Sequence, residues 1–279
     1  SGGNDGLNTV IPIDQYSNLS NARANVLIQE SKVLTLNGIT GTGLHPAMTG
    51  LRNMFNNGKL NIVQSVGYPN PNYSHFRATD IWHTASDSNV FLNSGWAGRY
   101  LEDIYPGFPT GYPSTAEPDP LAISIGYSVS TSLMGPTANT GMAISDPVSF
   151  YQLVTGTVDT APNTPAGHEL TYVRLVLQQT QQYNTTVKAA AQTVTNKATY
   201  PSNNTLADQL KIVANLIAGG LKTSIYTVSL GGFDTHSAQV SATGGNETGS
   251  HADLMKKLSD AIAAFQDDCE QLGIADRVA

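Results

Sequence analysis

The segment from Lys222 to His236 (KTSIYTVSLGGFDTH) constrains the fold more than any other part of the chain. Its first half is rich in β-branched and aromatic residues and carries no charge after Lys222, so it predicts a strand buried on both faces in a parallel sheet. Gly231 and Gly232 end that strand, and the loop beyond them carries Asp234 and His236, two side chains able to bind metals. In open α/β sheets ligands bind at the carboxyl ends of the strands, so we expect a site on this loop.

Amphipathic helices flank this strand on both sides. Residues 206–221 place leucine, valine and isoleucine at spacings of three and four before the strand, and residues 251–272 carry a similar apolar pattern after it. Helix, strand, loop and helix in this order are typical of an α/β protein with a mostly parallel sheet. We expect one such domain over residues 1–279, with an insertion or cap at residues 106–204.

Further elements are expected before and within the insertion. The insertion begins with a proline-rich loop at residues 106–120 and includes a strand at 121–125, a short helix at 146–153 and a long helix from His168 to about Thr195. Apolar spacing and helix-terminating residues predict the elements before it. These are helices at residues 21–29, 46–56 and 95–105, a helix opening at Ser74, and a buried strand at residues 60–66.

Charge and hydropathy bear on two questions, namely whether the chain binds nucleic acid and whether it crosses a membrane. A net charge of −7 argues against binding to a phosphate backbone, which needs a basic face, so nucleic acid is not expected as a partner. No apolar run is as long as a membrane span, so no transmembrane segment is expected in this chain. Only 13% of the residues are charged, and Asn, Thr, Ser and Gly take their place, which suits an exported protein.

Both ends of the sequence are interpreted as cut. Residues 1–8 resemble a loop without its preceding strand, and residues 276–279 resemble the beginning of a strand.

The glycine-rich turn at residues 2–9 has two interpretations. Asn, Asp and Gly tolerate the positive φ angles of tight turns, so turn chemistry alone explains the run Gly-Gly-Asn-Asp-Gly. The other interpretation makes Asp5 a metal ligand at the mouth of a strand that would precede Ser1.

Ser74 also has two interpretations. Most serines at the start of a helix cap it by accepting a backbone N–H bond, and this is the favoured reading. The other makes Ser74 a nucleophile, because the positive end of the helix and a nearby metal would favour both its alkoxide and an incoming anion. His75 and His83 lie eight residues apart, about two helical turns, so they could share a face of this helix. For His83, packing is the favoured role.

The polar segment at residues 237–250 is long enough to be a lid over a site. His251, at the start of the last helix, lies on the same side of the sheet as the Asp234 loop and could reach that site. Simple solvent exposure in a mobile lid is the favoured alternative for His251. Cys269 falls on the apolar side of this helix, where we expect it to act as a buried small hydrophobe.

Several short motifs together resemble the domain-of-unknown-function 1501 family, in that family's order and across nearly the whole chain. Members are bacterial, are commonly exported by the twin-arginine (Tat) route, and resemble the alkaline phosphatase and sulfatase superfamily. The resemblance therefore implies a periplasmic or cell-surface protein with a three-layer, doubly wound, mostly parallel α/β sheet like that of alkaline phosphatase. The motifs are Gly2-Gly-Asn-Asp-Gly-Leu-Asn8, Leu44-His-Pro-Ala47, Tyr68-Pro-Asn-Pro-Asn-Tyr-Ser-His-Phe76, Gly95-Trp-Ala-Gly-Arg99, Gly231-Gly-Phe-Asp-Thr-His-Ser237 and the His251-led helix ending in Ala264-Phe265.

The same resemblance implies an activity and roles for individual residues. The expected reaction is metal-dependent hydrolysis of a phosphate or sulfate ester through a covalent intermediate on Ser74. The substrate would be a small anionic or glycan-derived ester, and the divalent metal would be Zn, Mn or Ca. The alternative is a non-catalytic exported surface or carbohydrate-associated protein on the same fold. In the hydrolase, the metal ligands would be Asp5, Asp234 and His236, and the substrate contacts would be Asn8, His75 and His251.

Overall fold

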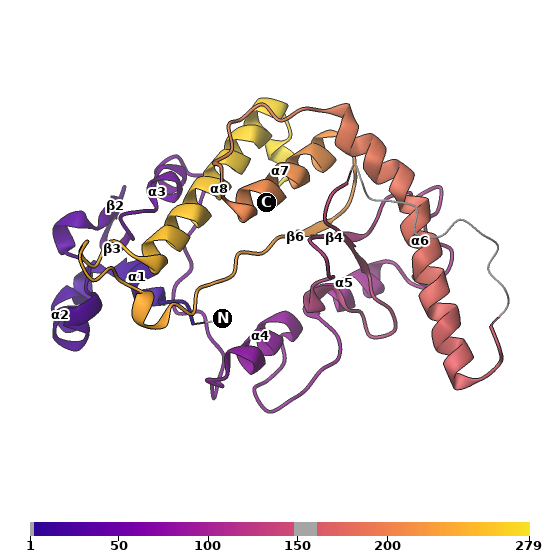
Figure 1. The fold of residues 1–279 in the computed structure, drawn as a ribbon, viewed down its shortest axis with the longest axis horizontal. Coiled ribbons are helices and arrows are strands. Elements are labelled where there is room, and N and C mark those ends of the chain that lie inside the picture. Colours follow the sequence, from indigo (N-terminus) through magenta and orange to yellow (C-terminus); the bar gives the residue numbers. More distant parts are fainter. Residues whose placement is uncertain (1–2, 148–160) are drawn as a thin grey trace. The chain divides into compact units, whose positions relative to one another are not determined.

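The computed structural model describes residues 3–147 and 161–279. The chain divides into two compact units, and Figure 1 labels their helices and strands. The first unit comprises residues 1–79, 198–210 and 229–271, and the second comprises residues 80–197, 211–228 and 272–279. Each unit contains its own three-stranded sheet.

The sheet of the first unit is antiparallel. Its strand order is β1 (Val10–Pro12), β3 (Ile39–Leu44), β2 (Leu34–Leu36), so β3 is the central strand. The sequence pattern did not predict β2 or β3, because glycines in β3 interrupt the alternation of apolar side chains. One of them is required: a Cβ atom on Gly43 would lie 2.4 Å from a methyl carbon of Val33.

Helices cover this sheet and form the core of the first unit. The side chains of Leu44, Met48, Leu51 and Met255 are buried together. Gly50 allows the third helix to approach the last one, since a Cβ atom there would lie 2.9 Å from the Cβ of Ala263. The helices with most of their residues in this unit are α1 (Gly6–Thr9), α2 (Tyr16–Arg23), α3 (Thr49–Asn56) and α8 (Ser250–Leu272).

Three predictions for this part of the chain need correction. Residues 60–66 form no strand, because no neighbouring strand pairs with them, and Val63 and Val66 are 74% and 59% exposed. The helix expected at residues 21–29 lies earlier, as α2, and is followed by a 3₁₀ turn at Ala24–Val26. Pro46 lies outside α3, in a turn where the amide of Ala47 donates to Nδ1 of His45 at 3.1 Å.

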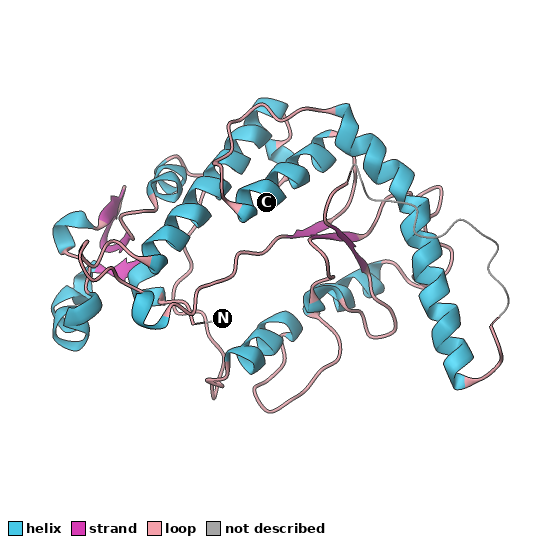
Figure 2. Ribbon diagram, in the orientation of Figure 1, coloured by secondary structure: helices cyan, strands magenta, loops and turns pink. Residues whose placement is uncertain are grey.

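The sheet of the second unit is parallel, with the order β5 (Gly141–Ile144), β4 (Ala122–Ile125), β6 (Ile225–Thr227) (Figure 2). Every residue of β4 is buried, as a central strand requires. The segment expected to form a strand buried on both faces gives only β6, which is short and half-buried. Within the described residues β6 pairs with β4 alone, so it is an edge strand.

Helix α5 (Trp96–Ile104) packs on this sheet through Ala97 and Leu101, which join Ala122 in one buried cluster. The remaining α-helices among the described residues are α4 (His75–Thr84), α6 (Pro165–Thr193) and α7 (Thr205–Ala218). The helices predicted at 95–105, from 168, at 206–221 and at 251–272 are confirmed, as is the strand at 121–125. The helix predicted at 146–153 falls almost wholly outside the described residues.

The structure is thus a mixed α/β protein with a small parallel sheet. Cys269 is 1% exposed, as expected for a small core residue, and burial raises the pKa of its thiol to about 11. Across residues 3–147 and 161–279, no helix combines the length and the apolar character that a membrane crossing needs.

Candidate functional site

All seven candidate residues belong to the first unit. Asp234 lies on the irregular segment after β6, and His236 begins a 3₁₀ turn (His236–Ala238). Nε2 of His236 donates to Oδ2 of Asp234 at 2.9 Å, and Nε2 of His75 lies 3.5 Å from the same oxygen. The structure therefore brings His75, Asp234 and His236 together around one carboxylate oxygen.

This cluster is open to solvent and locally strained. The side chains of His75, Asp234 and His236 are 49%, 45% and 78% exposed, so their mutual contacts add little to stability. His236 has a φ of +47°, in the left-handed region that non-glycine residues seldom adopt. Backbone strain of this kind is concentrated at functional sites in proteins.

Ser74 lies beside the cluster, at the N-terminus of α4. Its Oγ accepts from the amide of Arg77 at 3.5 Å, and its own amide donates to Oδ1 of Asn72 at 2.8 Å. The hydroxyl therefore makes the long capping contact that the favoured sequence interpretation requires. Ser74 is also exposed, so its Oγ is accessible from solvent.

The N-terminal turn touches the Asp234 turn. A Cβ atom added to Gly3, whose φ is +81°, would lie 2.7 Å from Oδ1 and 2.9 Å from Cα of Asp234. Only glycine permits this approach, because both the φ angle and the space exclude a side chain. Two segments more than two hundred residues apart in sequence thus meet at the candidate site.

Asp5 is held in a set of internal contacts. Its carboxylate caps α1 by accepting from the amide of Asn8 and forms an ion pair with Arg23, and it also accepts from the side chain of Gln239. Burial opposes ionisation of Asp5, but the bonds and charge of Arg23, with those of Gln239 and Asn8, outweigh it and hold its pKa below the ordinary value.

Asn8 and His251 are buried, at 6% and 2% exposure. The side-chain amide of Asn8 donates to the carbonyl oxygen of Val26 at 2.9 Å, so this donor is used within the fold. Nε2 of His251 donates to Oδ1 of Asn4 at 3.2 Å. The expectation that His251 is solvent-exposed in a lid is therefore wrong, and burial lowers its pKa.

His45 is a buried residue of this region that the sequence interpretation did not single out. Its ring packs edge-on against that of His251, with the ring centroids 5.6 Å apart and the planes at 71°. Burial first, and the neighbouring His251 second, lower the pKa of His45 to about 4. The available signal was the histidine in Leu44-His-Pro-Ala47, but β3 was needed to show that it points into the core.

The segment at residues 237–249 is held to other parts of the first unit by hydrogen bonds and an ion pair, so it does not form a free lid. Gln239 donates to Asp5, and Lys32 forms an ion pair with Glu247. The side-chain amide of Asn246 also donates to the carbonyl oxygen of Leu27 at 2.9 Å. These contacts close the segment over the N-terminal residues of the same unit.

Some of the candidate residues are free to bind a metal ion and others are not. In the described part of the chain, no group of three or more His, Cys, Asp or Glu side chains is arranged to hold a metal ion. Asp234 and His236 are metal-binding side chains 2.9 Å apart on an exposed turn, so they offer two ligands. Asp5 does not fit, because Arg23 already occupies its carboxylate.

The chain was compared with protein families, curated proteins and solved structures. No family model, curated protein or solved structure matches the chain significantly.

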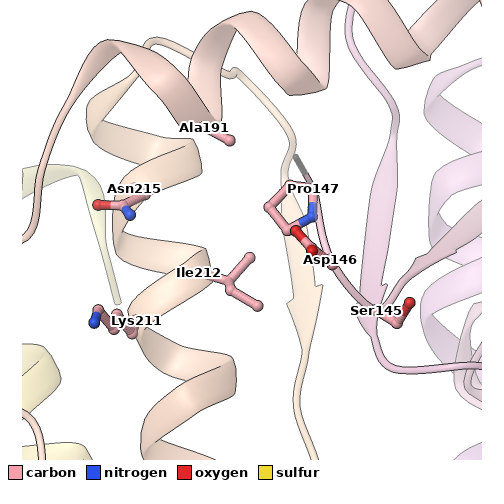
Figure 3. Close-up of a pocket in the computed structure, with 7 residues that line it drawn as sticks. All are labelled: Ser145, Asp146, Pro147, Ala191, Lys211, Ile212 and Asn215. Atoms are coloured by element: carbon pink, nitrogen blue, oxygen red, sulfur yellow. The ribbon is translucent and has the colours of Figure 1, made fainter. Parts of the chain in front are cut away.

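A cavity of about 220 Å³ lies in the second unit, at the carboxyl end of β5. Ser145, Asp146 and Pro147 form one side of it, and α7 forms the other (Figure 3). Ile212 extends from α7 toward Pro147 across the opening. None of the seven candidate residues lines this cavity, so it is separate from the cluster at Asp234.

Proposed function

We propose that the protein is an exported, periplasmic or cell-surface hydrolase of phosphate or sulfate esters with Ser74 as its nucleophile. In this proposal the chain is a relative of the domain-of-unknown-function 1501 family and has the three-layer, doubly wound fold of the alkaline phosphatase superfamily. The small parallel sheet with a wholly buried central strand is compatible with that fold.

The contact between Gly3 and Asp234 is the observation that carries the proposal. It means that the N-terminal turn, the Asp234 turn and His75 at the start of α4 meet in one place, as a site assembled from distant loops must. The second support is the position of Ser74, one residue before His75 and exposed at a helix N-terminus. The partial positive charge of that terminus favours an anionic ester beside the hydroxyl.

In the proposed reaction the Ser74 oxygen attacks phosphorus or sulfur and displaces the alcohol of the ester. The hydroxyl proton passes to the imidazole of His75, and that imidazole returns the proton to the departing oxygen. Water then hydrolyses the covalent intermediate and releases phosphate or sulfate together with free Ser74. Asp234 holds the His236 ring in position by accepting a hydrogen bond from its Nε2.

A divalent metal (Zn, Mn or Ca) at Asp234 and His236 is part of this proposal. When bound it would neutralise the charge of the ester and lower the pKa of the nucleophile. Two protein ligands leave further coordination positions for water and substrate. The metal would thus add to the charge stabilisation that the start of α4 provides.

Turnover of nitrophenyl phosphate and nitrophenyl sulfate by full-length protein, with Zn²⁺, Mn²⁺ or Ca²⁺ supplied, tests the proposal. Ser74→Ala should abolish turnover and shift the melting temperature by no more than about 2 °C, since only one weak capping bond is lost. Ser17→Ala, at an exposed position of α2, is the matched control. Unchanged turnover in Ser74→Ala would remove this residue from its role.

A second function is favoured by one specific observation, the occupation of Asp5 by Arg23. A non-catalytic exported surface or carbohydrate-associated protein would retain such loops for structure alone. Absence of bound zinc, manganese and calcium from the purified protein, together with absence of turnover on both esters, would favour this function over hydrolysis.

A further inference from the structure

The Asp5 carboxylate receives hydrogen bonds from three separate segments of the first unit. The two terminal nitrogens of Arg23, at the end of α2, donate one bond to each carboxylate oxygen. The side chain of Gln239 donates to Oδ2, and the amide of Asn8 donates to Oδ1 at 3.2 Å. A carboxylate has about four lone-pair sites, so four donors leave it without a free one.

The ion pair is also shielded from solvent. The side chains of Asp5 and Arg23 are 10% and 25% exposed. A two-pronged guanidinium–carboxylate contact is among the strongest charged hydrogen bonds in proteins, and shielding weakens the competition from water and salt. A metal ion would have to displace the guanidinium and leave its charge unpaired in a half-buried place, which is costly.

We propose that Arg23 is a built-in cation at Asp5, filling the position that a metal ion would otherwise take, so that Asp5 binds a metal only when the guanidinium is removed. This inference rests on the contacts of Asp5 alone. It holds whether or not Ser74 performs the proposed hydrolysis.

Polar side chains lie next to Asp5 and to its neighbour in sequence, Asn4. The Asn4 and Gln239 side chains carry amide oxygens, and His251 is bonded to Asn4. His251 and His45 are both buried, with their ring centroids 5.6 Å apart. Removal of the guanidinium would free one hydrogen-bonding site on each oxygen of the Asp5 carboxylate, and this makes the carboxylate available to a divalent ion.

Isothermal titration with Zn²⁺ and with Mn²⁺ tests the inference on the full chain and six variants. Asp5→Asn and Arg23→Lys should bind as many ions as the wild type, with Kd unchanged within about threefold. Arg23→Met should bind one additional ion per chain, and Asp5→Asn/Arg23→Met should lose that additional ion. Asp14→Asn and Arg52→Met, which change similar charges elsewhere in the first unit, should leave ion binding unchanged.

Two results would overturn the inference. One is a wild-type ion that Asp5→Asn removes or weakens more than about tenfold, because Asp5 would then be a ligand despite Arg23. The other is a folded Arg23→Met variant that gains no ion. If Arg23→Met does not fold, Asp5→Asn decides the matter, since an unchanged ion count supports the built-in cation and a lower one contradicts it.

Discussion

Tyr200 donates its hydroxyl hydrogen to Oδ2 of Asp268 at 3.0 Å, and the amide of Ala198 donates to Oδ1 of the same carboxylate at 3.0 Å. Asp268 is wholly buried in α8, so these two bonds fasten the segment before α7 to the last helix of the first unit. Burial first, and the bond to Asp268 second, raise the pKa of Tyr200 above its ordinary value.

Replacing Tyr200 by phenylalanine should lower the free energy of unfolding by about 1–3 kcal/mol, because a buried carboxylate loses a donor. Urea denaturation monitored by circular dichroism measures the change. Tyr73→Phe, at a position that is 91% exposed, should have almost no effect. Equal stability of Tyr200→Phe and wild type would show that the bond does not hold this segment.

The stability of the first unit should fall as the pH drops from about 6.5 to about 4. In the unfolded chain His45 binds a proton near its ordinary pKa of 6.5. In the folded protein burial lowers the pKa of His45, so the proton binds only near pH 4. The unfolded state therefore holds more protons in this window, and the stability present above pH 6.5 is lost on acidification, by at most roughly 3 kcal/mol. His251, whose pKa is also lowered by burial, acts in the same direction.

His45→Asn separates this effect from general acid unfolding, because asparagine keeps an acceptor for the amide of Ala47 but does not titrate. Urea midpoints between pH 4 and pH 7.5 should depend less steeply on pH in the variant than in the wild type. A slope as steep in the variant as in the wild type would contradict the assignment to His45.

Gly95→Ala should destabilise the second unit by about 2–3 kcal/mol through overpacking. Gly95 precedes α5, and a Cβ atom there would lie 2.2 Å from the carbonyl oxygen of Ser132 and 2.3 Å from that of Thr131. Neither oxygen is a flexible group, so the helix or the backbone must move. The melting temperature reports the loss, and Gly67→Ala, where the added carbon meets nothing within 4 Å, is the control.

Asn246→Ala should loosen the segment at residues 237–249. The variant removes the bond to Leu27, and the loss of one hydrogen bond of about 1 kcal/mol predicts roughly fivefold faster amide exchange around residue 246. Hydrogen exchange detected by mass spectrometry measures this rate. Thr243→Ala, exposed in the same segment, should exchange as the wild type does; equal rates in both variants would mean that Asn246 does not hold the segment.

Elements whose apolar residues repeat at helical spacing could be predicted from sequence, because the pattern itself specifies the buried face. Residues 251–272 are the clearest case, since α8 runs from Ser250 to Leu272. Strands depend on a partner that the local sequence does not contain. Residues 60–66 have the composition of a buried strand but have no neighbour to pair with, whereas the glycine-rich β3 pairs on both sides.

The candidate site shows the same limit at the level of single contacts. The turn residues identified Asp234 and His236 as neighbours, and their 2.9 Å contact is local. The partner of Asp5 is eighteen residues away in sequence and belongs to another helix, so no spacing rule pointed to Arg23. His45 likewise becomes notable only when the fold places it against His251.

The parallel sheet has a consequence for the order of folding. Its central strand pairs Ala122 with Ile225, so the hydrogen bonds along one edge of that strand form only after a segment made about a hundred residues later. The antiparallel sheet likewise gains its packing partner Met255 only near the end of the described chain. During synthesis the early segments of both cores must therefore wait, unpaired, until these later segments are made, which makes assistance by a chaperone more important for this protein than for one built from local contacts.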